Sequence, residues 1–146
     1  MEKRNESRDT AWAMSQVNVE VTRRAYEAFN RGDRNAMVAD IAPSFEYVAV
    51  GILPDAERIH HGPQGWLDFT RWLSDQFEDA RIEILELVPS GDRVMASVVL
   101  RGRGRQSGAE TSWHVWHVWS FRDAKVVHGR GIASREEALE AAGLSE

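Results

Sequence analysis

The pattern of hydrophobic and polar positions predicts helices that are separate in sequence from a run of long strands. Apolar positions spaced as on one face of a helix predict helices over residues 18–31, 35–41, 64–78 and 135–143. Alternating or β-branched runs predict strands over residues 45–50, 58–61, 81–88, 93–105, 110–121 and 125–133. Helices segregated from a largely antiparallel sheet indicate an α+β fold.

The run from Thr111 to Phe121 is the most informative strand, because its alternation sorts large residues onto two faces. Trp113, Val115, His117, Trp119 and Phe121 share one face. A turn over residues 122–125 would place Phe121 opposite Val126. It would then place Trp119 opposite His128 and His117 opposite Arg130. Two histidines and an arginine are therefore expected on the aromatic face.

The neighbouring strand predicts that this face lines a pocket. With Ser107-Gly108 as a two-residue loop, His117 would face Val98 and Trp119 would face Ala96. Small residues beside large aromatic ones leave room, so we expect a ligand pocket between this face and the two main helices. Its expected lining is Trp119, Phe121, Val98, Tyr47, Trp66 and Phe69.

The opposite face of the same strands predicts a homodimer. It would carry Met95, Val99, Trp116 and Val118, with Trp116 and Val118 over Gly131 and Gly129 of the last strand. Such a flat apolar patch is unusual for the surface of a monomer, so a second copy is its expected cover. The alternative is that the C-terminal segment folds back over this face.

Composition narrows the class of protein. A chain of 146 residues with 42% hydrophobic and 28% charged residues is expected to form one domain, over residues 14–146, after a disordered extension over residues 1–13. The net charge of -5 argues against nucleic acid binding, and Arg101, Arg103 and Arg105 are interpreted as one solvated strand face. No apolar run is long enough for a membrane span. The chain has no cysteine, for which a reducing cytoplasm is the simplest location.

Four segments carry a resemblance to a known family. They are residues 19–33 (VEVTRRAYEAFNRGD), 61–65 (HGPQG), 117–127 (HVWSFRDAKVV) and 135–141 (REEALEA). Together they resemble SnoaL-like proteins of the nuclear-transport-factor-like superfamily, whose members include polyketide cyclases, ketosteroid isomerases, dehydratases, epoxide hydrolases and non-catalytic binding domains. The resemblance implies a curved mixed sheet wrapped around N-terminal helices as a cone with one pocket, commonly in a dimer. A fold of this breadth does not choose the reaction.

The resemblance also suggests positions for the chemistry. His117 looks equivalent to the catalytic acid of the cyclases and isomerases, and Tyr47 to the isomerase base. The isomerase helix tyrosine falls near Ala25, with Tyr26 adjacent and able to turn inward. None of these positions is a carboxylate here, and no Asp-Arg-Asp set of the epoxide hydrolases is evident.

Three hypotheses of function follow from these residues. As an isomerase, cyclase or hydrolase of an apolar carbonyl compound, the protein would use His117 for proton transfer and Arg130 to hold a carboxylate or an enolate oxygen. Tyr47 completes the candidate catalytic residues. The candidate ligand-binding residues are His128, Trp119, Phe121, Trp66, Phe69, Tyr26 and Val98. The alternatives are a small-molecule binding module and an interaction domain with a filled core.

Metal and cofactor sites are not expected. His114 and His117 lie an odd number of residues apart on a strand, so they point to opposite faces and cannot share an ion. No glycine-rich phosphate loop follows a strand, so no nucleotide cofactor is predicted. Glu83 faces inward only if the connection over residues 89–92 is even in length.

Overall fold

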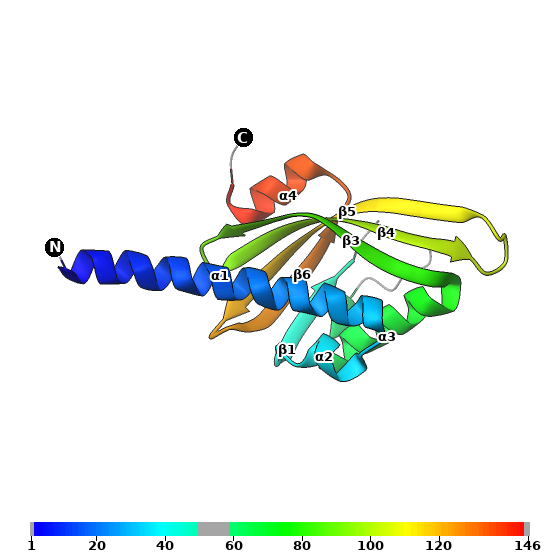
Figure 1. Ribbon diagram of the computed structural model, residues 1–146, viewed down its shortest axis with the longest axis horizontal. Coiled ribbons are helices and arrows are strands. Elements are labelled where there is room, and N and C mark those ends of the chain that lie inside the picture. Colours follow the sequence, from blue (N-terminus) through cyan, green and yellow to red (C-terminus); the bar gives the residue numbers. More distant parts are fainter. Residues whose placement is uncertain (1, 50–58, 145–146) are drawn as a thin grey trace.

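The computed structural model describes residues 2–49 and 59–144 and shows a six-stranded sheet between two layers of helices (Figure 1). In chain order the elements are α1 (Glu2–Arg31), α2 (Arg34–Val38), β1 (Ile41–Val48), β2 (Ile59–His61), α3 (Gly62–Gln76), β3 (Phe77–Ser90), β4 (Arg93–Gly104), β5 (Glu110–Arg122), β6 (Lys125–Ile132) and α4 (Arg135–Ala142). The strand order is β2-β1-β6-β5-β4-β3. Only β1 and β6 pair in parallel among these neighbours, so the sheet is mixed. The predicted α+β fold with a curved mixed sheet is confirmed.

The first helix is longer than the sequence pattern predicts. It begins at Glu2, so residues 2–13 continue the helix where the sequence predicts a disordered extension. The N-terminal part of α1 projects beyond the sheet (Figure 1). Trp12 and Met14 are 67% and 53% exposed there. Low apolar content made this segment look unstructured, yet Glu, Lys, Arg and Ala are good helix formers that can extend an existing helix.

The main core lies on the concave side of the sheet, under α1, α2 and α3. The inner positions of β4 are Val94, Ala96, Val98 and Leu100, all buried. They pack with the inner residues of β5 and with helix residues such as Tyr26, Trp66 and Phe69. Apolar alternation along each strand thus places one face against the helices, as the sequence predicts.

The pairing of β5 with β6 contains a β-bulge that the sequence analysis missed. Phe121 pairs with Val126 as expected, but the next pair is Ser120 with His128, which leaves Val127 as an extra residue on β6. The predicted pairs of Trp119 with His128 and of His117 with Arg130 are therefore wrong. The structure pairs these two residues of β5 with Gly129 and Gly131. A slip of one residue turns His128 and Arg130 to the opposite face.

The pairing of β4 with β5 differs from the prediction by two residues. The connection is longer than Ser107-Gly108, because the Gly104 N–H donates to the Ala109 carbonyl at 2.9 Å. His117 therefore faces Ala96, and Val98 faces Val115. A slip of two residues keeps every side chain on its predicted face, so the aromatic face survives the error.

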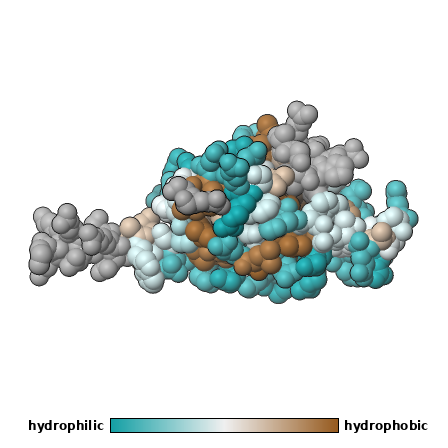
Figure 2. Space-filling view, turned by 90° about the horizontal axis from the view of Figure 1, so that it is seen from above, coloured by the Kyte–Doolittle hydropathy of each residue, from teal (hydrophilic) through white to brown (hydrophobic). Residues whose placement is uncertain are grey.

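The C-terminal helix covers part of the outer face of the sheet. Met95 and Val118 are buried there with Ile132 and with Ala138 and Leu139 of α4, while Trp116 and Val88 pack at the edge. Figure 2 views the side on which α4 lies and shows a mainly hydrophilic surface with smaller hydrophobic areas. The C-terminal segment therefore folds back over Met95 and Val118, which is the alternative to a second copy in the sequence analysis.

The bulge also changes the pairs on which the dimer argument rested. Trp116 lies opposite Ile132, and Val118 lies opposite Arg130, instead of opposite Gly131 and Gly129. The outer face of β5 therefore meets side chains on β6 at these positions instead of bare backbone.

Candidate functional site

Four aromatic side chains form a hydrogen-bonded network inside the cone. The Tyr26 hydroxyl lies 2.7 Å from Nδ1 of His117, and the Tyr47 hydroxyl lies 3.0 Å from Nε2 of the same ring. The indole N–H of Trp119 donates to the Tyr26 hydroxyl at 2.8 Å. All four side chains are buried. Both nitrogens of His117 are therefore engaged by phenols, and the network is closed to bulk water.

Three elements far apart in sequence supply the network. Tyr26 comes from α1, Tyr47 from β1, and His117 and Trp119 from the inner face of β5. Gly129 of β6 makes the packing possible, since a Cβ at this position would overlap the indole of Trp119 and crowd the ring of Tyr47. The Trp119 ring also stacks on that of Tyr47, with centroids 5.7 Å apart.

Burial decides the protonation states of the network. It lowers the pKa of His117 to about 3, because the imidazolium form would lose its hydration. It also raises the pKa of Tyr47 and of Tyr26 well above that of an exposed phenol, and for Tyr26 the hydrogen bond from Trp119 opposes that rise. At neutral pH the site therefore holds a neutral imidazole and two neutral phenols.

The network has more hydrogens than acceptors. The Trp119 N–H, the two phenol O–H groups and the single N–H of neutral His117 give four hydrogens. The contacts among these residues form three hydrogen bonds. Whichever nitrogen of His117 carries the proton, one phenol hydrogen is left without an acceptor within the network. We call it the spare hydrogen.

Two small apolar cavities flank the network. The α1-side cavity is lined by Val21, Thr22, Ala25, Tyr26, Met37, Ile41, Phe45, Trp66, Trp119 and Val126. The α3-side cavity is lined by Tyr47, Trp66, Phe69, Thr70, Leu73, Ile82, Val98, Leu100, Val115 and His117. Each offers about 30 Å³ to the centre of a water-sized molecule. Trp66 borders both cavities and stands edge-on to Trp119, at a centroid distance of 5.4 Å.

The cone is more completely filled than its small residues predict. A Cβ at Gly102 would meet the side chain of Phe77, so this side chain fills the space beside the glycine. Phe77 packs in turn against Trp113. Phe121 is buried on the inner face, but it lines a separate hollow beside the N-terminal half of α1. The expected single pocket is therefore divided and narrowed by aromatic side chains.

Three polar residues of the sequence-based hypotheses lie outside the cone. Arg130 is exposed on the outer face, opposite Val118. His128 pairs with Ser120 and Glu83 pairs with Val99, which are positions of the same outer face. His128 lies 4.0 Å from Glu46, and Glu83 lies 2.8 Å from Arg101. The predicted positions of Arg130 and His128 in the pocket are wrong, because the bulge at Val127 reverses the faces of β6.

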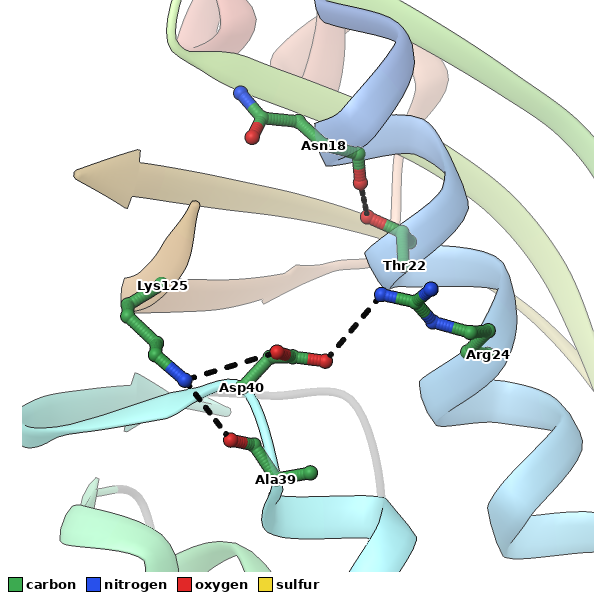
Figure 3. Close-up of polar contacts among 6 residues, drawn as sticks. All are labelled: Asn18, Thr22, Arg24, Ala39, Asp40 and Lys125. Carbon is green, nitrogen blue, oxygen red and sulfur yellow. Dashed lines mark hydrogen bonds and ion pairs between the residues drawn. The ribbon is translucent and has the colours of Figure 1, made fainter. Parts of the chain in front are cut away.

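Ion pairs hold α1 against the strands beside the α1-side cavity. Figure 3 shows Asp40 between Arg24 of α1 and Lys125 at the start of β6. Asp40 lies 3.7 Å from each of these cations, and Lys125 also donates to the Ala39 carbonyl at 3.1 Å. Each residue of this triad is the chain neighbour of a residue that lines the cavity. The groups are well exposed, so their contribution to stability is small.

A larger hollow of about 500 Å³ lies elsewhere, where β3 begins, β4 ends and β5 begins. Its lining is polar and comprises Glu78, Asp79, Arg101, Gly102, Arg103, Glu110, Thr111 and Ser112. Each arginine of the 101–105 stripe has a glutamate within 4 Å: Glu83 for Arg101, Glu110 for Arg103 and Glu78 for Arg105. The arginines of this stripe are thus half-exposed and paired with glutamates. None of the residues that line the hollow belongs to the aromatic network.

No three His, Asp or Glu side chains within residues 2–49 and 59–144 converge as ligands for a metal ion. Within the same ranges no helix is both long and apolar enough to cross a bilayer.

A family model described as a SnoaL-like domain matches residues 22–129. The chain belongs to the SnoaL-like family. The match extends from α1 to Gly129 and so includes every residue of the network. No curated protein matches the chain.

Solved structures share the fold of this SnoaL-like protein. One is an NTF2-like protein of unknown function from Burkholderia pseudomallei, with 22% identity and a TM-score of 0.72 over 85% of this chain and 95% of that one. A second, TerC co-crystallised with polyporic acid, has 19% identity and a TM-score of 0.72 over 87% and 98%. A third, provisionally assigned as a SnoaL-like polyketide cyclase from Jannaschia sp. CCS1, has 16% identity and a TM-score of 0.70 over 90% and 94%.

Among the residues predicted to line a pocket, the structure brings Tyr26, Tyr47, Trp66, Phe69, Val98, His117 and Trp119 around the two cavities. Sequence reasoning left out Thr70 and Val115, which also line the α3-side cavity. Thr70 lies on the same helical face as Phe69 and Trp66, and Val115 lies two residues from His117 on the same face of β5. Both therefore carried a usable signal.

Proposed function

We propose that this SnoaL-like protein binds a small, neutral, mostly apolar compound in the cone, through a carbonyl oxygen that accepts a hydrogen bond from Tyr47. The observation that carries the proposal is the spare hydrogen. A buried hydroxyl donor without an acceptor is costly, on the order of 1–3 kcal/mol, and a ligand acceptor removes that cost. Tyr47 borders the α3-side cavity, whose remaining walls are almost entirely hydrophobic.

The charge of the ligand follows from the surroundings of Tyr47. Arg130 lies on the outer face, and His117 is neutral because burial lowers its pKa to about 3. None of the described residues that line the two cavities is Lys or Arg, so a carboxylate there would be buried without a cation from these residues, which is strongly unfavourable. The expected ligand is a ketone, a quinone or another neutral carbonyl compound. That TerC, a protein of the same fold, was crystallised with polyporic acid is consistent with ligand binding in this fold.

The alternative is an isomerase, cyclase or hydrolase that acts on the same class of compound. A phenol that donates to a carbonyl oxygen would polarise it, as such reactions require. Proton transfer also needs a base, and none of the described residues that line the two cavities is Asp or Glu. His117 is a weak base with both nitrogens in hydrogen bonds. The geometry therefore favours binding over turnover.

The proposal is tested by calorimetric titration with cyclohexanone and cyclohexanecarboxylate. We expect cyclohexanone to bind and the carboxylate not to bind, and Tyr47→Phe to weaken cyclohexanone binding by about tenfold, the value of one lost hydrogen bond. Thr70→Val is the matched control. It removes a hydroxyl from the same cavity, but that hydroxyl already donates to the Leu67 carbonyl at 3.0 Å. Equal affinities in the wild type and Tyr47→Phe would overturn the proposal.

We also infer that the protein is a homodimer whose interface is the part of the outer sheet face that α4 leaves open. This part includes the partly exposed Val99 and Trp116. Light scattering at micromolar concentration should give a dimer mass that Val99→Asp reduces to the monomer mass. A monomer mass for the unaltered chain would end this inference.

A further inference from the structure

We propose that the cone contains a second carbonyl site, at Tyr26 in the α1-side cavity, and that the tautomer of His117 allows only one of the two sites to present a donor hydrogen at a time. This inference rests on the proposed function, because both sites use the same spare hydrogen. It adds the site at Tyr26, and it states that only one of the two phenols can offer a hydrogen to a ligand at a time.

The exclusion follows from the two ways of placing the hydrogens. When the proton is on Nδ1 of His117, this nitrogen donates to the Tyr26 oxygen and the Tyr47 hydroxyl donates to Nε2, which leaves the spare hydrogen on Tyr26. When the proton is on Nε2, this nitrogen donates to the Tyr47 oxygen and the Tyr26 hydroxyl donates to Nδ1. The spare hydrogen is then on Tyr47. The bond from Trp119 to Tyr26 persists in both arrangements.

The two phenols border different cavities. Tyr26 lines the α1-side cavity and Tyr47 lines the α3-side cavity. The exchange between the two arrangements keeps all three hydrogen bonds and moves only hydrogens. A third state with a charged imidazolium, which would donate from both nitrogens, is strongly disfavoured because burial lowers the pKa of His117 to about 3.

The ligand class is the same at both sites. Tyr26 and Tyr47 each line an apolar cavity, so a site at either phenol would suit an acceptor that carries no donor of its own, such as a ketone. A ketone in one cavity fixes the tautomer that leaves the other cavity without a donor. By linkage, each ligand then weakens the binding of the other by the same factor. We expect a factor of about five or more, because the second carbonyl would have no partner.

The experiment uses the full chain labelled with [15N]histidine and titrated with cyclopentanone. Two variants close one cavity each without touching the network: Ala25→Leu fills the α1-side cavity, and Val115→Leu fills the α3-side cavity. The protonated and unprotonated nitrogens of a neutral imidazole have well-separated 15N shifts, so the tautomer of His117 is read directly. We expect cyclopentanone to drive Ala25→Leu to the Nε2–H form and Val115→Leu to the Nδ1–H form.

Several outcomes would overturn the inference. The same tautomer in both saturated variants, or two cyclopentanone molecules bound to the wild type with equal affinity, would remove the exclusion while leaving the Tyr47 site intact. Binding to Ala25→Leu but not to Val115→Leu would remove the second site alone. Absence of binding to the wild type and to both variants would contradict the proposed function itself.

Discussion

The indole N–H of Trp119 donates to the hydroxyl of Tyr26, a residue 93 positions earlier in the chain, at 2.8 Å. This bond joins α1 to β5, an inner strand of the sheet. Tyr26 also contacts Nδ1 of His117, so its hydroxyl serves two groups of β5 at once. The packing of α1 and the orientation of the imidazole therefore depend on the same oxygen.

We expect Tyr26→Phe to destabilise the protein more than Tyr47→Phe does. The first change leaves both the Trp119 N–H and one side of His117 without a partner, whereas the second removes a partner from His117 alone. Each buried group left unsatisfied costs about 1–3 kcal/mol. Urea unfolding of both variants checks the order, and the two changes are matched because each removes one phenol oxygen. A larger loss for Tyr47→Phe would contradict this account of the network.

Gly129→Ala is expected to displace Trp119. A methyl group at this position overlaps the indole and crowds Tyr47, so the ring must move away from Tyr26. Overpacking of this kind costs about 1–3 kcal/mol, to which the loss of the hydrogen bond adds. Thermal unfolding and the near-ultraviolet circular dichroism of the tryptophans should both change.

The double variant Gly129→Ala, Trp119→Phe is the control for that prediction. A smaller ring leaves room for the new methyl group, so Gly129→Ala should cost less in the Trp119→Phe background than in the wild type. Equal costs in both backgrounds would mean that the backbone conformation at Gly129, and not the indole, makes the glycine necessary.

The sequence predicts the faces of the strands better than their pairing. The aromatic face of β5 follows from alternation alone, and it survived an error of two residues against β4 because such a slip preserves the faces. The predicted pairing of β5 with β6 was wrong by one residue, which turned Arg130 and His128 to the opposite face of the sheet. No local signal marks Val127 as a bulge, since Val126-Val127 reads as ordinary strand. Tertiary packing around Trp119 and Gly129 decides it.

The residues of the candidate site could be predicted from the sequence, but the extent to which side chains fill the cone could not. His117 and Trp119 follow from period-two alternation. The family resemblance pointed to Tyr47, and it placed Tyr26 next to the position of the isomerase helix tyrosine. The filled cone does not follow, because Phe77 enters the space beside Gly102 from a bend at the α3–β3 boundary. The cover of Met95 by α4 was equally hidden, since a short helix with few apolar residues shows little preference for where it packs.

The helix α4 is expected to stabilise the outer face through Leu139. This side chain is 8% exposed and packs with the buried Met95 and Val118. Leu139→Ala should cost about 2–5 kcal/mol, as for other buried leucines. Glu140→Ala, at an exposed position of the same helix, is the matched control and should change stability by less than about 0.5 kcal/mol. Similar effects of the two changes in denaturant unfolding would show that α4 does not pack on the sheet in solution.

The stability of the protein should fall as the pH is lowered from about 6.5, and His117 should be a principal cause. Burial lowers the folded-state pKa of His117 to about 3, whereas an unfolded histidine titrates near 6.5. Between these values the unfolded chain binds a proton that the folded protein does not, so the free energy of unfolding decreases with falling pH by up to about 1.4 kcal/mol per pH unit.

His117→Gln keeps a polar side chain between Tyr26 and Tyr47 but cannot titrate. Urea unfolding from pH 7 to pH 4 gives the slope of the free energy of unfolding against pH for each protein. All other titrating groups are common to both proteins, so the difference between the wild-type and His117→Gln slopes is the contribution of His117. Parallel slopes would mean that His117 takes up its proton over the same pH range in the folded and the unfolded protein, and the lowering of its pKa by burial would then be wrong.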